Sequence, residues 1–156
     1  MKKLIACLFC ISLINANEFL EKFDEYPATI YQGEHKIPKD YQCSNGECRD
    51  INNKLVDLSI NFAGKYSIIT HSCGTGCRFY SMLNVENGED NLKILSSFNT
   101  IPDVNGKETI NDLFSKNDSR LLVVKTIGDT GCKQETFLFD GNSLELLSQL
   151  ESYIEQ

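Results

Sequence analysis

One short segment of the chain combines residue types that could perform chemistry. Residues 71–78 read His-Ser-Cys-Gly-Thr-Gly-Cys-Arg. A cysteine becomes a nucleophile as its thiolate, and a neighbouring histidine can accept the proton. The segment therefore permits an enzyme hypothesis in which Cys77 is the nucleophile and His71 is the base. A second Gly-Cys segment, Thr130-Gly131-Cys132-Lys133, has no histidine. This favours a role for the Gly-Cys pair in the geometry of the loop instead of a role in catalysis.

The same segment also fits a binding function. Glycine permits close backbone approach, and a disulfide across the loop would lower the cost of ordering it on binding. Arginine is common at the energetic centres of interfaces. The predicted binding residues are His71, Gly74, Thr75, Gly76 and Arg78.

Two further interpretations of the segment remain. His71, Cys73, Cys77 and Cys132 form a ligand set that zinc accepts, although exported proteins use cysteine mainly for disulfides. In the simplest interpretation the loops are tight strand connections, where glycine supplies positive φ and cysteine forms a covalent staple. The pattern favours this structural role over catalysis or metal binding, and no metal or cofactor is predicted.

The first 16 residues have the pattern of a secretion signal. Lys2 and Lys3 precede an uncharged apolar run over residues 4–13, and Ala16 supplies a small residue before the expected cleavage. The run is too short to span a bilayer, which needs about 20 apolar residues. We therefore expect a periplasmic or secreted protein that keeps no membrane span after cleavage.

The charge of the chain excludes some classes of partner. The full chain carries a net charge of −7, and loss of Lys2 and Lys3 leaves −9. Nucleic acids and anionic membranes need clusters of basic residues, so neither is an expected partner. A cationic protein would be attracted, less strongly at high salt.

Export makes disulfides the expected state of the cysteines. Removal of residues 1–16 leaves five of the seven cysteines, an odd number, so at least one has no partner among the other four. Cys43 and Cys48 flank the turn dipeptide Asn45-Gly46, which predicts a bridge between them. The sequence leaves open whether Cys73 bonds Cys77 or whether Cys132 bonds one of these two.

An internal repeat predicts the architecture. Residues 65–78 align without a gap on residues 120–133, and both segments end in Thr-Gly-Cys followed by a base. In each unit we expect a strand, a Gly/Cys loop, a second strand, a glycine turn and a third strand. The second and third strands are expected over residues 78–85 and 92–98, and again over 133–139 and 144–150.

The predicted fold is mainly β, with two repeated antiparallel meanders arranged like propeller blades or as a sandwich. The repeat units cover about residues 62–98 and 117–150 of a single domain, residues 17–156. One or two short helices are expected, over residues 17–26 and as a turn over 108–114. The last strand begins near Leu144, and its sequence is compatible with helix after Ser148.

Several spaced motifs within residues 61–150 resemble a family of short exported bacterial proteins. They are Asn61-Phe62-Ala63-Gly64-Lys65-Tyr66, the Cys73–Cys77 loop, residues 119–124 and Phe139-Asp140-Gly141. The family carries Trp-Gly before the first loop cysteine, where this chain has His71-Ser72. The family has no assigned activity, so the resemblance implies export and a repeated β fold only.

Export, negative charge and a glycine-rich loop together predict a non-catalytic binding protein. The specific hypothesis is an inhibitor or immunity protein for a cationic cell-wall hydrolase, with residues 71–78 occluding the cleft of the enzyme. The alternatives are the Cys77 enzyme and a purely structural module of the cell envelope.

Overall fold

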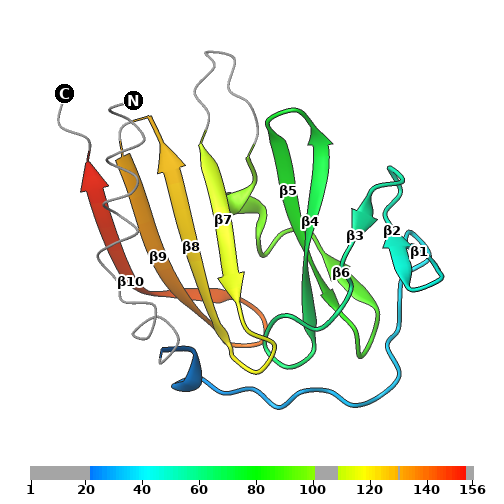
Figure 1. Ribbon diagram of the computed structural model, residues 1–156. Helices are drawn as coiled ribbons and strands as arrows, with labels where there is room; N and C mark the ends of the chain where they lie inside the picture. The colour runs from blue at the N-terminus through cyan, green and yellow to red at the C-terminus, as the bar shows by residue number, and fades with distance from the viewer. Residues whose placement is uncertain (1–21, 101–108, 130, 154–156) are drawn as a thin grey trace.

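The computed structural model describes residues 22–100, 109–129 and 131–153, with side chains through residue 151. Three antiparallel sheets make up most of this part of the chain, which confirms the mainly β prediction. Residues 1–16 with their predicted signal, residues 17–21 of the predicted helix and Thr130 lie outside the described residues. Figure 1 shows the three-stranded sheet β4–β6 (within residues 66–91) between the four-stranded sheet β7–β10 (within residues 110–153) and the small sheet β1–β3 (within residues 42–56).

Both predicted meanders are present. The first consists of β4 (Tyr66–Gly74), β5 (Cys77–Asn84) and β6 (Glu89–Asn91), in that spatial order. The second consists of β8 (Leu121–Gly128), β9 (Gly131–Phe139) and β10 (Leu144–Tyr153). In each unit the Gly-Cys pair, Gly76-Cys77 or Gly131-Cys132, lies at the start of the second strand, as the repeat predicts.

Two sequence predictions about individual elements are wrong, and a third that was left open is decided. The third strand of the first unit lies at residues 89–91 instead of 92–98, because Asn91 accepts hydrogen bonds from the next backbone N–H groups and turns the chain into the 3₁₀ helix η1 (Ser96–Phe98). The helical turn expected over residues 108–114 is instead β7 (Ile110–Ser115), which pairs with β8. Strand β10 stays extended past Ser148, because it pairs with β9 up to Tyr153.

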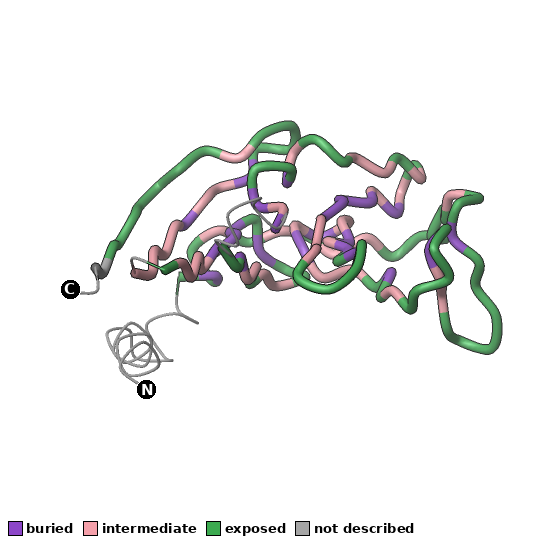
Figure 2. Tube along the Cα trace, turned by 90° about the horizontal axis from the view of Figure 1, so that it is seen from above, coloured by how far each residue is buried: buried purple, intermediate pink, exposed green. Residues whose placement is uncertain are grey.

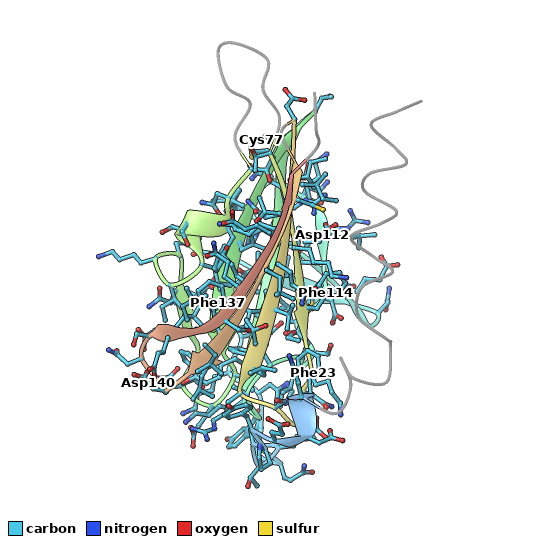
Figure 3. All side chains as sticks on the ribbon, turned by 90° about the vertical axis from the view of Figure 1, so that its left-hand side faces the viewer. Phe23, Cys77, Asp112, Phe114, Phe137 and Asp140 are labelled. Carbon is cyan, nitrogen blue, oxygen red and sulfur yellow. A yellow bond between two sulfur atoms is a disulfide. The ribbon has the colours of Figure 1, made fainter. Side chains whose placement is uncertain are left out.

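The two meanders share one hydrophobic core. Strand alternation sends Tyr80 and Met82 of β5 toward the second sheet, and sends Leu122 and Val124 of β8 toward the first. Phe62, Leu95, Phe98 and Phe139 complete this cluster. Buried residues gather between the sheets in Figure 2, whereas β10 is largely exposed on its way to the C-terminus. Phe137 and Phe114 project from opposite faces of the second sheet (Figure 3).

The motif Asn61–Gly64 is a structural turn that begins the first meander. The Asn61 side chain donates to the carbonyl of Ile68 and accepts from its backbone N–H, at 3.0 and 2.7 Å. Phe62 is fully buried in the core. Gly64 has a φ of 77° and lies against the carbonyl oxygen of Thr29, where a Cβ would fall 2.1 Å from that oxygen. Packing therefore explains why these residue types stand together.

A small sheet covers the other face of the first meander. It consists of β1 (Gln42–Ser44), β2 (Glu47–Arg49) and β3 (Leu55–Val56). Asn45 and Gly46 both have positive φ, which gives the tight turn between β1 and β2 that the sequence predicts. The predicted Cys43–Cys48 disulfide is present across this hairpin. We call residues 41–58 the cover, because Tyr41 and Leu58 pack on Ile69 and Leu83 of the first meander.

Of the described residues 22–26 of the predicted N-terminal helix, residues 22–24 are helical. Phe23, within this helical turn, packs with Leu121 and Val123 in a small cluster on the face of the second sheet away from the shared core. Within the described ranges, every helix is too short or too polar to cross a membrane.

Candidate functional site

The connection between β4 and β5 is an exposed tip closed by a disulfide, and we call residues 72–77 the hairpin tip. Cys73 and Cys77 are bonded to each other, which settles the alternatives for this pair. Gly74 and Gly76 have φ values of 127° and 70°, a region that side chains with a Cβ disfavour. Residues 72–76 are exposed. The tip lies at the end of the molecule opposite Asp140 (Figure 3), so it is both accessible and covalently constrained.

Cys132 takes no part in closing the hairpin tip. It lies in β9 opposite Ile127. Its interaction partner is neither of the tip cysteines, because those two are bonded to each other. The alternative in which Cys132 bonds Cys73 or Cys77 is therefore wrong.

Arg78 joins the first meander to strand β7 of the second sheet. Its Nη1 atom lies 3.1 Å from Asp112 Oδ1, 3.4 Å from the carbonyl oxygen of Asn111 and 3.4 Å from the hydroxyl of Tyr80. The hydrogen bond to Tyr80 first, and then the one to Asp112, raise the pKa of Arg78. The side chain remains 40% exposed, so it can still face a partner from this braced position.

His71 lies beneath the hairpin tip instead of on its surface. Only 6% of the residue is exposed, and its ring stacks on Phe79 with centroids 4.6 Å apart. Its Nδ1 atom lies 3.1 Å from Asp50 Oδ2, and its Nε2 atom lies 3.0 Å from Ser81 Oγ. Asp50 belongs to the cover, so His71 links the cover to the first meander.

The order Asp50–His71–Ser81 matches the hydrogen-bond order of a serine hydrolase triad. Ser81 is, however, completely buried, and the hydroxyl of Tyr41 lies 3.5 Å from its Oγ atom. Tyr41 in turn donates to Asp90. A nucleophile must reach a substrate, and this hydroxyl has no exposed surface. The arrangement is therefore a buried polar network that attaches the cover.

The network changes the ionisation of Asp50. Burial by itself would raise the pKa of this carboxyl. Hydrogen bonds from His71 and from the backbone N–H groups of Lys54 and Asn52 outweigh burial and lower the pKa below its ordinary value of 3.8. Asp50 is thus held ionised by donors from its own loop and from β4.

The structure argues against both chemical alternatives for the 71–78 segment. Cys77 is bonded to Cys73, so it offers no thiolate, and both ring nitrogens of His71 already contact other side chains. The hypothetical zinc set would need both bonded cysteines as separate thiolates. Within the ranges that the structure describes, no three His, Cys, Asp or Glu side chains group closely enough to hold a metal ion.

Most of the predicted binding residues do meet around one cavity. A cavity of about 310 Å³ lies beside the edge strand β4, and His71, Gly74, Gly76 and Arg78 line it. Thr75 lies at the exposed apex of the tip and does not line this cavity. The five predicted residues are therefore neighbours, but they divide between an exposed apex and a partly enclosed flank.

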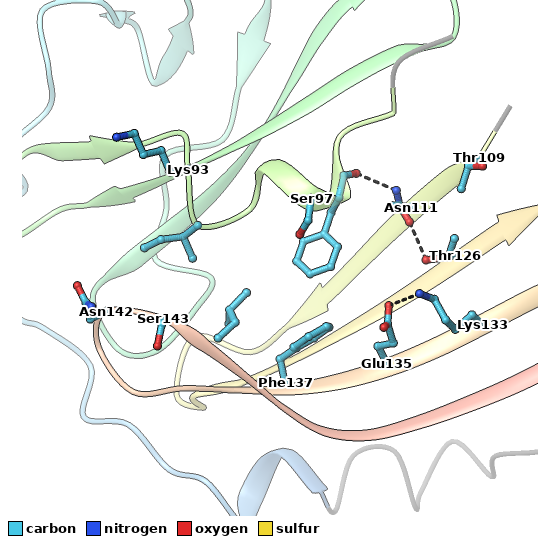
Figure 4. Close-up of a pocket in the computed structure, with 13 residues that line it drawn as sticks. Lys93, Ser97, Thr109, Asn111, Thr126, Lys133, Glu135, Phe137, Asn142 and Ser143 are labelled. Carbon is cyan, nitrogen blue, oxygen red and sulfur yellow. Dashed lines mark hydrogen bonds and ion pairs between the residues drawn. The ribbon is translucent and has the colours of Figure 1, made fainter. Parts of the chain in front are cut away.

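A larger concave site was not predicted from the sequence, and we call it the sheet groove. Its volume is about 630 Å³, and it lies between the inner face of β7–β9 and the segment around η1 (Figure 4). Lys133 and Glu135 form an ion pair on its floor, with Nζ and Oε2 2.9 Å apart. Asn111 and Thr126 are hydrogen-bonded beside this pair. Its lining comes from segments 93–98, 109–111, 126–137 and 142–144.

The sequence held only one indication of the sheet groove. The repeat aligns Lys133 with Arg78, and the structure places both bases on the faces that the two meanders turn toward each other. The remaining lining residues are far apart in sequence and follow no shared pattern. Only the packing of η1 over the second sheet brings them together.

No protein-family model matches the chain, and no curated protein or solved structure matches it either. The resemblance to exported bacterial proteins therefore stays a prediction. A proposal about function therefore has to be argued from the geometry of the described residues.

Proposed function

We propose that this chain is an exported, non-catalytic binding protein that inhibits a cationic cell-wall hydrolase. The observation that carries the proposal is the exposed hairpin tip closed by the Cys73–Cys77 disulfide. In this proposal Thr75 and the flanking glycines enter the cleft of the enzyme.

The tip has the physical properties of an inhibitory loop. A flexible loop loses conformational entropy when it binds, and a disulfide removes much of that cost in advance. Gly74 and Gly76 add no side chains that would keep the backbone away from a cleft wall. Arg78, held by Asp112 at the base of the tip, supplies a donor whose position is already fixed.

The charge of the chain supports a cationic partner. A net charge of −7 attracts a basic enzyme over long distances and accelerates encounter. Two disulfides among the described residues are compatible with an oxidising compartment such as the periplasm or the extracellular space. Cell-wall hydrolases act in those compartments, so inhibitor and enzyme would meet there.

Inhibition of purified enzymes tests the proposal. The full chain is added to a panel of purified cationic muramidases and amidases, and peptidoglycan hydrolysis is followed at increasing ionic strength. We expect inhibition of at least one enzyme, weakening about tenfold or more as salt screens the opposite charges. Absence of inhibition across the panel, or inhibition insensitive to salt, would contradict the proposal and favour a structural module.

A matched pair of variants locates the contact. Thr75→Arg adds bulk and positive charge at the apex of the tip, so we expect inhibition to weaken at least about tenfold. Asn117→Arg adds the same charge in the turn between β7 and β8, which lies at the opposite end of the molecule (Figure 1), and should leave inhibition nearly unchanged. Equal effects of the two variants would exclude the tip as the contact.

A further inference from the structure

We propose that the sheet groove is a second binding site, which takes a short uncharged oligosaccharide. The proposal is independent of the hairpin tip, because the groove is formed by the second sheet and η1. Its volume of about 630 Å³ lies within the range of small-molecule sites. Its lining combines apolar groups with hydrogen-bonding groups, and a sugar carries the same two kinds of surface.

One end of the groove offers fixed polar groups. The Glu135 side chain is only 13% exposed, and its one ion-pair partner among the described residues is Lys133. An ammonium group has three donors and a carboxylate has several acceptor positions, so one ion pair leaves capacity on both. Thr126 donates to Asn111 at 2.7 Å, and its hydroxyl oxygen can still accept. Donors and acceptors thus stand side by side, as vicinal hydroxyl groups require.

The middle of the groove is apolar. Phe137 is partly exposed and meets Phe98 at an edge-to-face angle of 61°, with centroids 5.4 Å apart. Ile94 and Leu144 line the same stretch. The C–H face of a pyranose ring is apolar and packs on aromatic rings, whereas its rim carries hydroxyl groups. Asn142 and Ser143 then provide polar groups at the far end (Figure 4).

Charge and desolvation disfavour the competing ligand classes. An anionic ligand would face Glu135 and the net charge of −7. A cationic ligand would face Lys93 and Lys133, which line the groove together. An acyl chain would cover the ion pair with methylene groups and strip its water without replacing those hydrogen bonds. A neutral polyhydroxylated ligand avoids both charge repulsions, and its hydroxyl groups can replace the water around the ion pair.

Titration of the isotope-labelled full chain, followed by ¹H–¹⁵N correlation spectra, tests the site. The probes are chitotetraose, cellotetraose and maltotetraose, with tetraalanine and octanoate as competing classes. We expect saturable shifts with at least one glycan, concentrated in β7–β9 and around η1, and none with the two other probes. The proposal is overturned if no glycan saturates, if the peptide or the fatty acid binds in its place, or if the shifts map to the hairpin tip.

Variants separate recognition from folding. Glu135→Gln keeps the size of the side chain but loses the carboxylate, so glycan affinity should fall about tenfold or more. Thr126→Val removes a hydroxyl at constant shape and should weaken binding in the same direction. Thr75→Arg, at the hairpin tip, should keep full glycan affinity. Spectral dispersion shows whether each variant is folded, and a folded Glu135→Gln variant with unchanged affinity contradicts the proposal.

Glycan binding and enzyme inhibition can fail independently. A chain that binds glycan but inhibits no hydrolase would remove the tip proposal and leave the groove. A chain that inhibits a hydrolase but binds no glycan would contradict the groove proposal and leave the tip proposal standing. Loss of inhibition in Thr75→Arg together with retained glycan binding would support two separate sites.

Discussion

At the scale of single residues, the surroundings of His71 decide what its imidazole can do. The ring lies between Asp50 and Ser81, stacks on Phe79 and is almost completely buried. A buried polar group must keep its hydrogen bonds, because losing a partner leaves an unsatisfied atom away from water. The network therefore helps to hold the cover on the first meander, and weakening it should lower the free energy of unfolding.

Asp50→Asn tests this network. The variant should lower the free energy of unfolding at neutral pH by about 1–3 kcal/mol, because charged hydrogen bonds to His71 and to the loop backbone are weakened. Chemical denaturation followed by fluorescence or circular dichroism measures the change. Asp57→Asn is the control, since Asp57 is exposed and should change stability by less than about 0.5 kcal/mol.

The same carboxyl predicts a pH dependence. Because the pKa of Asp50 is lowered on folding, its contribution is complete above the ordinary value of 3.8 and is lost as the pH falls through the lower folded value. The wild-type chain should therefore lose stability on acidification below about pH 4. The Asp50→Asn variant should show a shallower loss there, and parallel curves for the two chains would refute this role of Asp50.

At the scale of elements, close backbone approaches decide where glycine is required. The turn before β4 brings Gly64 against the Thr29 carbonyl at a positive φ. The turn between β1 and β2 gives Gly46 a similar φ of 82°, but nothing lies within 4 Å of its would-be Cβ. These two glycines share a conformation and differ in their surroundings, so they form a natural comparison.

Gly64→Ala and Gly46→Ala should differ in cost. Each places a side chain in the left-handed region, which costs about 1–2 kcal/mol. Gly64→Ala adds a clash with a backbone oxygen, so we expect a total of about 3 kcal/mol or more. Thermal and denaturant unfolding of both variants gives the comparison. A cost at Gly64 no larger than that at Gly46 would show that the segment around Thr29 moves away freely.

At the scale of the whole molecule, hydrogen bonds at the end of the shared core fix the first meander to strand β7 of the second sheet. The hydroxyl of Tyr80 in β5 donates to the carbonyl oxygen of Asn111 in β7, at 2.7 Å and away from water. The neighbouring Arg78–Asp112 ion pair is about 40% exposed on both sides. Burial makes the first bond the more important, since solvent screens the second.

Tyr80→Phe should lower the free energy of unfolding by about 1–2 kcal/mol, because it removes the shorter, buried hydrogen bond to the Asn111 carbonyl and leaves only the 3.4 Å contact from Arg78. Arg78→Ala should cost less than about 1 kcal/mol. Tyr31→Phe serves as control, because the hydroxyl of Tyr31 makes only a 3.4 Å contact with the nearby Glu34 carbonyl in an exposed loop. Equal costs for Tyr80→Phe and Tyr31→Phe would mean that the sheets are held by apolar packing alone.

Local and periodic features were accessible from the sequence alone. The repeated run of apolar residues, Gly/Cys loop and second strand predicted both hairpins, because strand pairing across a tight turn depends on neighbouring residues. The Asn45-Gly46 dipeptide predicted the Cys43–Cys48 bridge for the same reason. Strand β7 was missed, because its pairing with β8 was not recognised and Ile110, Leu113 and Phe114 also fit a helical face.

Tertiary structure decided which residues meet. The two hairpins pair in registers that differ by one residue when the repeats are aligned, and β4–β5 carries an irregularity between Ser72 and Gly74. Side chains alternate along a strand, so this single step turns His71 toward Asp50 of the cover, whereas its repeat counterpart Thr126 faces the sheet groove. The sequence by itself determined the strands and their turns. Register and the packing of distant segments, which depend on contacts across the whole core, determined the buried network and the groove.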